Sequence, residues 1–79
     1  MKEIKLTEKG AKVLIAMKEN GLDSVDKAVL SKDIAALAFL LPAGVPGVLT
    51  SLARNGLVGK TEDTPKKYFL TQDGVDFSL

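Results

Sequence analysis

Apolar residues recur at helical spacing along the first quarter of the chain. The pattern after Thr7 predicts a helix from Glu8 to Asn20, with Thr7 as its cap and Gly21 as its stop. The predicted buried stripe of this helix consists of Ala11, Leu14, Ile15 and Met17.

A second helix is predicted after a short polar stretch and a brief extended piece at Ala28 to Leu30. Ser31 is a suitable N-cap for this helix, because its hydroxyl can accept from a free backbone N–H of the first turn. The predicted inner face of the helix consists of Ile34, Ala35, Leu37, Ala38 and Leu41.

The stretch "LLPAGVPGVLTSLARNGLV", residues 40–58, predicts a third helix with an unusual beginning. Val45, Leu49 and Leu52 recur at helical spacing, and Gly56 is a C-terminal stop. A proline costs about 3 kcal/mol inside a helix but little in the first turn, where its missing N–H would have no partner. The helix is therefore expected to start close to Pro42, with Pro46 in or at the edge of its first turn.

A β-hairpin is predicted after this helix. Leu57 to Lys60 and Lys67 to Leu70 carry apolar residues and are separated by the turn sequence "TEDTP". The hexapeptides "LTEKGA" and "LTQDGV" share the same capping pattern, so a short last helix is expected after Thr71. This order predicts a single domain over residues 1–79 that is mainly α with a small hairpin (α+β): a winged helix with a three-helix core.

Composition narrows the possible functions. The 79 residues contain neither cysteine nor histidine, so disulfides, thiol or histidine catalysis and the common zinc sites are excluded. The glycines fit no phosphate-binding or dinucleotide motif, and neither an enzyme nor a cofactor or metal is expected. The longest apolar run is short and broken by proline, so we expect no membrane span and a cytoplasmic location.

The segment from Ile34 to Val58, with its "NGLV" ending, and the later "KKYFLTQDG" resemble the winged helix-turn-helix family of bacterial regulators, notably its MarR-like and PadR-like branches. The resemblance extends from about Thr7 to Phe77. It implies a winged-helix core, duplex DNA as partner and a role in transcription regulation. The turn between the two helices of the motif usually holds a glycine, where this chain has Phe39. Either the second helix runs longer, or Phe39 takes a strained left-handed conformation.

The resemblance implies a DNA-binding surface on the third helix and the wing, although the formal net charge is only +1. The outward residues of the third helix offer two hydroxyls and one guanidinium for hydrogen bonds, and Lys32 begins the second helix. The candidate DNA-binding residues are Lys32, Thr50, Ser51, Arg54, Lys60, Lys66 and Lys67. Two alternatives remain open. The lysines and hydroxyls are simply solvated, and Arg54 stabilises the negative C-terminal end of the helix dipole.

An alternative function follows from the small and apolar residues at the start of the third helix. Base readout requires donors and acceptors, and the two prolines remove backbone donors from this turn. An uncharged apolar surface is typical of a protein interface, which predicts a protein partner or a homodimer. The candidate interface consists of Phe39, Leu40, Pro42, Ala43 and Pro46.

Overall fold

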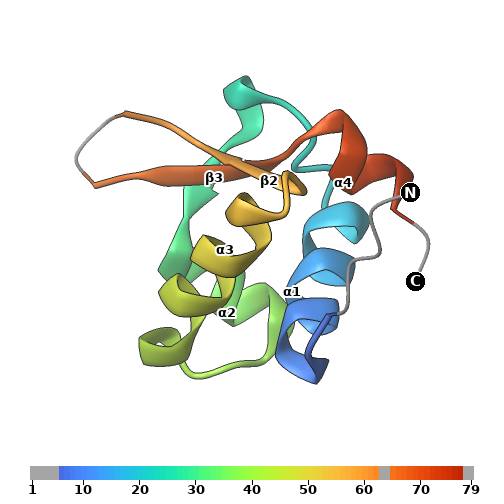
Figure 1. The fold of residues 1–79 in the computed structure, drawn as a ribbon. Coiled ribbons are helices and arrows are strands. Elements are labelled where there is room, and N and C mark those ends of the chain that lie inside the picture. The colour runs from blue at the N-terminus through green and yellow to red at the C-terminus, as the bar shows by residue number, and fades with distance from the viewer. Residues whose placement is uncertain (1–5, 63–64, 78–79) are drawn as a thin grey trace.

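The computed structural model describes residues 6–62 and 65–77 and contains a helical bundle with a small sheet at one end (Figure 1). The elements in chain order are α1 (Glu8–Glu19), the 3₁₀ turn η1 (Val25–Lys27), β1 (Val29–Leu30), α2 (Ser31–Ala38), the 3₁₀ turn η2 (Pro42–Gly44), α3 (Val45–Arg54), β2 (Val58–Lys60), β3 (Lys67–Leu70) and α4 (Gln72–Asp76). The predicted fold class is confirmed: three helices form the core and an antiparallel hairpin forms the wing.

The core lies where α1, α2 and α3 meet beneath the sheet. α1 contributes Val13, Leu14, Ala16 and Met17, and α2 contributes Ile34, Ala35 and Ala38. The other large contributions come from Val45, Leu49, Leu52, Leu57, Val58 and Leu70, so the predicted inner face of the third helix is confirmed. The hairpin leaves this core and extends beyond the helices (Figure 1).

The predicted stripe of α1 was partly wrong. Ile15 is 40% exposed and Ala11 is half-buried, whereas Val13 and Ala16 are buried. The buried arc is centred on Met17, and at about 100° per residue Ile15 lies about 160° away from it. The helix also ends at Glu19, with Asn20 as its C-cap.

The predicted inner face of the second helix was also partly wrong. Leu37 is 38% exposed and Leu41 is 82% exposed, because the helix ends at Ala38 and the periodicity that would bury Leu41 stops there. Leu40 instead packs against the core. Ser31 is the first helical residue rather than the cap; Leu30 occupies the cap position, without a side-chain capping bond.

Phe39 ends α2 in the left-handed conformation, with φ 57° and ψ 42°. The Leu40 N–H donates to the Ala35 carbonyl at 2.9 Å, which closes the helix as a Schellman motif usually does with glycine. The second of the two alternatives for Phe39 is therefore confirmed. A left-handed conformation costs an L-residue roughly 1–2 kcal/mol, and the Phe39 side chain, which is 94% exposed, gains little burial in return.

The prolines lie at helix starts as predicted, but α3 itself begins at Val45, three residues after Pro42. Pro42 begins the turn η2, and Pro46 stands in the first turn of α3, where its missing N–H breaks no helical bond. α3 ends at Arg54, and the Leu57 N–H then donates to the Leu52 carbonyl at 3.0 Å. The chain turns directly from α3 into the buried start of the hairpin.

The sheet has the strand order β1-β3-β2, with both pairs antiparallel. β2 and β3 pair as predicted, with Lys60 opposite Tyr68 and Val58 opposite Leu70. β1 adds a third strand by pairing Val29 with Tyr68. Asp63 and Thr64 of the predicted turn lie outside the described residues.

The two threonine caps are confirmed. The Gly10 N–H donates to Thr7 Oγ1 at 3.0 Å, and the Gly74 N–H donates to Thr71 Oγ1 at 3.1 Å. The two glycines differ in their surroundings: a Cβ on Gly74 would overlap the Leu57 carbonyl oxygen, whereas a Cβ on Gly10 would stand 3.3 Å from Thr7 Oγ1. Gly74 is therefore required for α4 to lie against the start of the hairpin, whereas the packing of α1 does not require a glycine at position 10.

Phe39→Gly should stabilise the fold by about 0.5–1 kcal/mol, because the left-handed strain that it removes outweighs the small loss of buried surface and the added unfolded-state entropy. Urea denaturation at low protein concentration measures this change in the free energy of unfolding. Leu41→Gly is the matched control, because Leu41 is also exposed but has an ordinary φ of −69°. This substitution relieves no strain, so it should destabilise the fold slightly. A less stable Phe39→Gly variant would contradict the strain assigned to this residue.

Gly74→Ala should lower the free energy of unfolding by about 1–3 kcal/mol, because the added methyl group forces α4 away from Leu57. For a domain of this size each kcal/mol corresponds to roughly 4–8 °C in Tm, which thermal denaturation followed by circular dichroism resolves. Gly10→Ala at the equivalent capping position should be close to neutral. Equal melting temperatures for the two variants would refute the close approach at Gly74.

Candidate nucleic-acid interface

The outer surface of η2 and α3 is exposed and almost uncharged. Inward-facing Val45, Leu49 and Leu52 leave the opposite side of the helix to solvent. The exposed residues on that side are Ala43, Gly44, Pro46, Gly47, Thr50 and Ser51, with Arg54, also exposed, at its end. Short side chains at the beginning of this surface permit another molecule to approach the backbone closely.

The Thr50 hydroxyl is engaged within the helix. Its Oγ1 donates to the Pro46 carbonyl at 2.9 Å, one turn earlier. This leaves Thr50 its lone pairs, so it can accept a hydrogen bond from a base amino group more readily than it can donate to a phosphate. Ser51 lies at the edge of a shallow hollow that it shares with Gly10 and Gly47.

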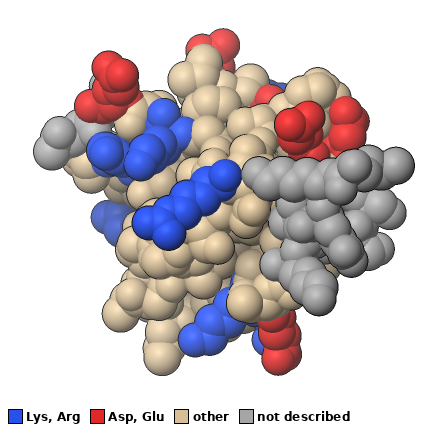
Figure 2. All heavy atoms as spheres, viewed as in Figure 1, with Lys and Arg blue, Asp and Glu red and all other residues tan. Residues whose placement is uncertain are grey.

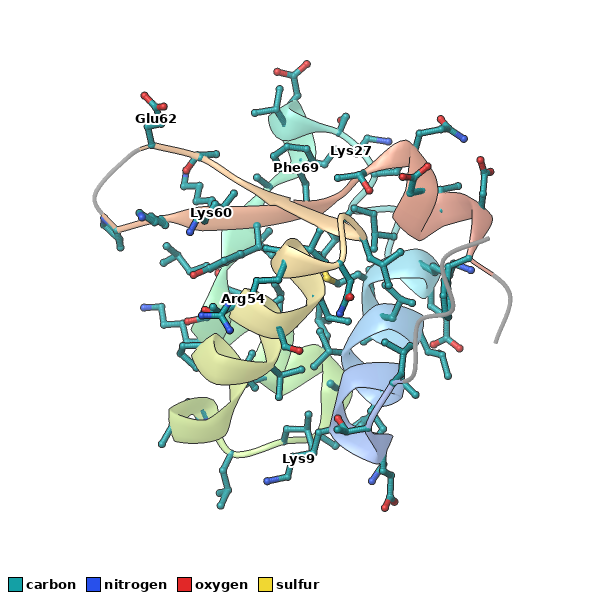
Figure 3. The ribbon with its side chains drawn as sticks, in the orientation of Figure 1. Lys9, Lys27, Arg54, Lys60, Glu62 and Phe69 are labelled. Atoms are coloured by element: carbon teal, nitrogen blue, oxygen red, sulfur yellow. The ribbon has the colours of Figure 1, made fainter. Side chains whose placement is uncertain are left out.

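Arg54 and Lys60 lie on the same side of the molecule. Lys60 and Tyr68 are paired, and they share a sheet face with the buried pair Val58 and Leu70, because side chains alternate along a strand. Lys60 therefore points to the side of the sheet that faces α3, and Figure 3 shows it between the hairpin and Arg54. In the same view Glu62 points away on the other side of the hairpin.

The remaining wing lysines are arranged differently. Lys67 pairs with Leu30, one position out of phase with Tyr68, so its side chain lies on the sheet face opposite Lys60. Its backbone closes the neck of the wing: the Lys67 N–H donates to Thr61 Oγ1 at 3.0 Å, and the Thr61 N–H donates to the Lys67 carbonyl at 2.9 Å. Lys66 is exposed just before β3.

Lys32 is exposed in the first turn of α2, next to Asp33. Its position at the start of the helix is the one predicted, but a carboxylate follows it directly. Asp33 therefore offsets much of the positive potential that Lys32 contributes to this surface.

Lys9 is a basic residue that the sequence analysis missed. Its Nζ lies 3.9 Å from where a Cβ on Gly44 would stand, and it borders the hollows on both sides of η2. Figure 3 shows Lys9 at the far end of the bundle from Lys60, with Arg54 between them. No local signal could have found it, since only the packing of α1 beside η2 brings Lys9 to this surface.

Basic side chains therefore lie around the uncharged first turns of α3. Figure 2 shows them over the wing and the middle of the molecule on the face that carries α3, with acidic side chains at the top, toward α4, beside the wing and at the bottom. The positive potential of this surface comes from Arg54 at the end of α3 and from neighbouring elements, not from the first turns of α3.

The residues of the alternative interface are mostly exposed. Phe39, Pro42, Ala43 and Pro46 are open to solvent, whereas Leu40 is half-buried against the core. Leu41, which was expected inside, adds an exposed side chain to the same turn. Phe39 and Leu41 border a hollow with Ala43 and Val48.

No single helix among the described residues is long and apolar enough to cross a membrane. The segments Ser31–Ala38 and Pro42–Arg54 reach the length and apolar composition of a membrane span only when they are taken together, and the chain bends by 120° between them.

Solved structures similar to this chain include those of NadR and ZitR. No protein-family model matches the chain, and no curated protein sequence matches it. The crystal structure of NadR in complex with 4-hydroxyphenylacetate matches with a TM-score of 0.69 and 26% identity, covering 87% of this chain and 47% of NadR. The structure of a mutant of Lactococcus lactis ZitR matches with a TM-score of 0.70 and 23% identity, covering 95% of this chain and 49% of ZitR.

The chain thus spans about half the length of the two structures. Both are MarR-family transcriptional regulators, which are not enzymes. The match covers the elements from which the sequence pattern predicted a winged helix. The chain therefore has the winged helix-turn-helix fold of the MarR-family regulators, as its resemblance to the MarR-like branch predicted.

Proposed function

We propose that the chain is a winged-helix transcriptional regulator that contacts duplex DNA through α3 and the wing. The observation that carries this proposal is the alignment of Arg54 and Lys60 on the side of the molecule where α3 is exposed (Figure 3). The fold supports it, because MarR-family regulators bind DNA.

In this proposal α3 lies toward the major groove and the lysines contact phosphates. Thr50 accepts from a base amino group, Ser51 donates or accepts, and Arg54 reaches a phosphate or a guanine edge. Lys60 contacts the backbone beside the groove. Additional phosphate contacts come from Lys32, Lys66 and Lys67.

Sequence discrimination should be modest. Bidentate contacts from Arg, Lys, Asn or Gln each contribute about 1–3 kcal/mol of base discrimination, and α3 presents one such side chain. Pro42 and Pro46 also lack the N–H groups through which a helix start binds phosphate. With a net charge of +1, the affinity of the chain for DNA is expected in the nonspecific range of roughly 10⁻⁴–10⁻⁶ M at physiological salt.

Protein recognition through the turn from Phe39 to Pro46 is a second candidate function. It is favoured by the exposure of two large apolar side chains in one turn, 94% for Phe39 and 82% for Leu41. Such side chains are typical of an interface core when they lie together without charges.

Arg54→Ala and Lys60→Ala should each weaken DNA binding several-fold and lower the slope of log K against log salt by about 1. Titrations of a fluorescent duplex between about 50 and 200 mM salt measure both quantities. Lys67→Ala should have a smaller effect, since Lys67 faces the other side of the wing. Lys27→Ala, which removes the same charge from η1, is the matched control.

An affinity loss in Lys27→Ala as large as that in Lys60→Ala would mean that only overall charge matters, and it would refute an interface at α3 and the wing. Unchanged binding in both Arg54→Ala and Lys60→Ala would have the same consequence.

A chemical-shift titration with mixed duplex DNA at low salt should move the amide signals of Thr50, Ser51, Arg54 and Lys60. Signals of η1 should stay in place, because Lys27 of that turn lies beyond the hairpin from Arg54 (Figure 3). The absence of shifts in α3 and the wing would exclude the DNA proposal and leave the protein-binding candidate.

A further inference from the structure

The chain contains the sequence Asn–Gly–Leu twice, and each copy ends a helix. Asn55 is the C-cap of α3 and is followed by Gly56, and Asn20 is the C-cap of α1 and is followed by Gly21. Both glycines are left-handed, with φ 77° at Gly56 and φ 66° at Gly21. The two sites are therefore matched in sequence and in backbone conformation.

An asparagine that precedes glycine can react without any other reagent than water. The glycine backbone nitrogen, once it has lost its proton, attacks the side-chain amide carbon of the asparagine. A C–N bond forms, the amide nitrogen leaves as ammonia, and a cyclic succinimide remains. Water then opens the ring at either carbonyl, which gives aspartate or isoaspartate. Glycine favours the reaction because it has no Cβ to obstruct ring closure.

We propose that Asn55 is a site of spontaneous deamidation and that the carboxylate formed there weakens DNA binding. The reaction itself does not depend on DNA, whereas its effect on DNA binding rests on the function proposed above. Asn20 is the matched site, where the same reaction leaves the proposed DNA-binding surface unchanged.

The folded backbone restrains ring closure at Asn55 through local bonds of the last turn of α3. The Asn55 ψ is 2°, and the Gly56 N–H donates to the Ala53 carbonyl at 3.0 Å, so the attacking nitrogen is held away from the side chain. The Asn55 Nδ2 donates to the Ser51 carbonyl at 3.1 Å. Helix ends open at a much lower free-energy cost than a buried core. The reaction therefore requires only that this turn opens.

The side chain of Asn55 is held less firmly than that of Asn20. The bond from Asn55 to Ser51 is exposed to solvent, whereas Asn20 Nδ2 donates to the Ala16 carbonyl at 2.8 Å through a partly buried bond. Water competes directly for an exposed hydrogen bond, so such a bond contributes little net stability. We therefore expect the folded chain to deamidate faster at Asn55 than at Asn20.

Aspartate at position 55 changes the end of α3 at which its basic group stands. A carboxylate has no N–H to donate to the Ser51 carbonyl, so the capping bond is lost. Its negative charge is unfavourable at a helix C-terminus. The charge also stands next to Arg54 in the chain, where it offsets the guanidinium and repels phosphate.

Isoaspartate at the same position has a further effect, because its backbone is longer by one carbon atom. The junction after α3 is held from both sides: the Leu57 N–H donates to the Leu52 carbonyl at 3.0 Å, and the Thr71 hydroxyl donates to the Gly56 carbonyl at 2.6 Å. A longer backbone cannot keep both bonds without a shift. The hairpin that carries Lys60 is therefore expected to move relative to α3.

Peptide mapping by mass spectrometry, after incubation of the chain at mildly alkaline pH without DNA, tests the chemical step. In urea, both sites should be modified at equal rates, because both are Asn–Gly–Leu. In the folded chain, modification at position 55 should exceed modification at position 20. Asn55→Gln keeps an amide but should stay unmodified there, because its ring would be larger and forms far more slowly.

Titrations of the fluorescent duplex test the consequence. Asn55→Asp should bind DNA several-fold more weakly than the wild type. Asn20→Asp is the matched control, because it changes the net charge equally and loses the equivalent capping bond, but it stands next to Glu19 instead of Arg54. It should bind DNA like the wild type, and circular dichroism should show that both variants are folded.

The aged wild-type chain, separated from unmodified chain by ion exchange, should bind DNA at least as weakly as Asn55→Asp. Asn55→Gln should lose no affinity during the same incubation, which separates deamidation at this site from general damage.

Two results would overturn the proposal. The first is a folded chain that is modified at position 20 but not at position 55. The second is an Asn55→Asp variant that binds DNA as tightly as the wild type while Arg54→Ala and Lys60→Ala bind weakly. If those two variants also bind like the wild type, the proposed function has failed and the effect on DNA fails with it, whereas the mass-spectrometric comparison still decides the chemical step.

Discussion

The burial of one side of α3 against α1 and α2 is the contact on which the remaining structure depends. Val45, Leu49 and Leu52 are at most 2% exposed, and they fix the rotation of α3 about its axis. The opposite side of the helix must then face solvent, which places Thr50 and Arg54 outward. Leu57, also buried, fixes the point at which the hairpin leaves the core. One packing arrangement thus determines both the exposed helix surface and the direction of the wing.

The prolines and glycines before and within α3 are compatible with that packing because of where they stand. Pro42 starts a separate 3₁₀ turn and Pro46 lies in the first turn of α3, so neither interrupts an established helical bond. Their effect is chemical instead: the start of the helix has short side chains and few donors. Basic groups must come from outside these first turns, and Lys9, Arg54 and Lys60 come from α1, the end of α3 and β2. The surface is therefore better suited to backbone contact with a polyanion than to detailed base readout.

The strained turn at Phe39 separates two surfaces of different character. On one side lie η2 and α3 with their basic neighbours, and on the other lies a shallow hollow between α1 and α2, bordered by Lys12 and Glu19. Natural sequences are mostly consistent between local preference and fold, and they depart from this at functional sites. A bulky aromatic residue in a left-handed conformation is such a departure, and it occurs where the two surfaces meet.

The sequence by itself determined the features that depend on residues close together in the chain. The caps at Thr7 and Thr71, the burial of Leu49 and Leu52 and the pairing of the hairpin were predicted because they rest on capping, helical spacing and turn chemistry. Only the tertiary structure decided which of the apolar residues of the first two helices are buried. Ile15, Leu37 and Leu41 are as hydrophobic as their buried neighbours, but a bundle of three short helices has too little interior for all of them. The proximity of Lys9 to Gly44, and of Gly74 to Leu57, likewise joins distant segments, and local spacing carries no information about such contacts.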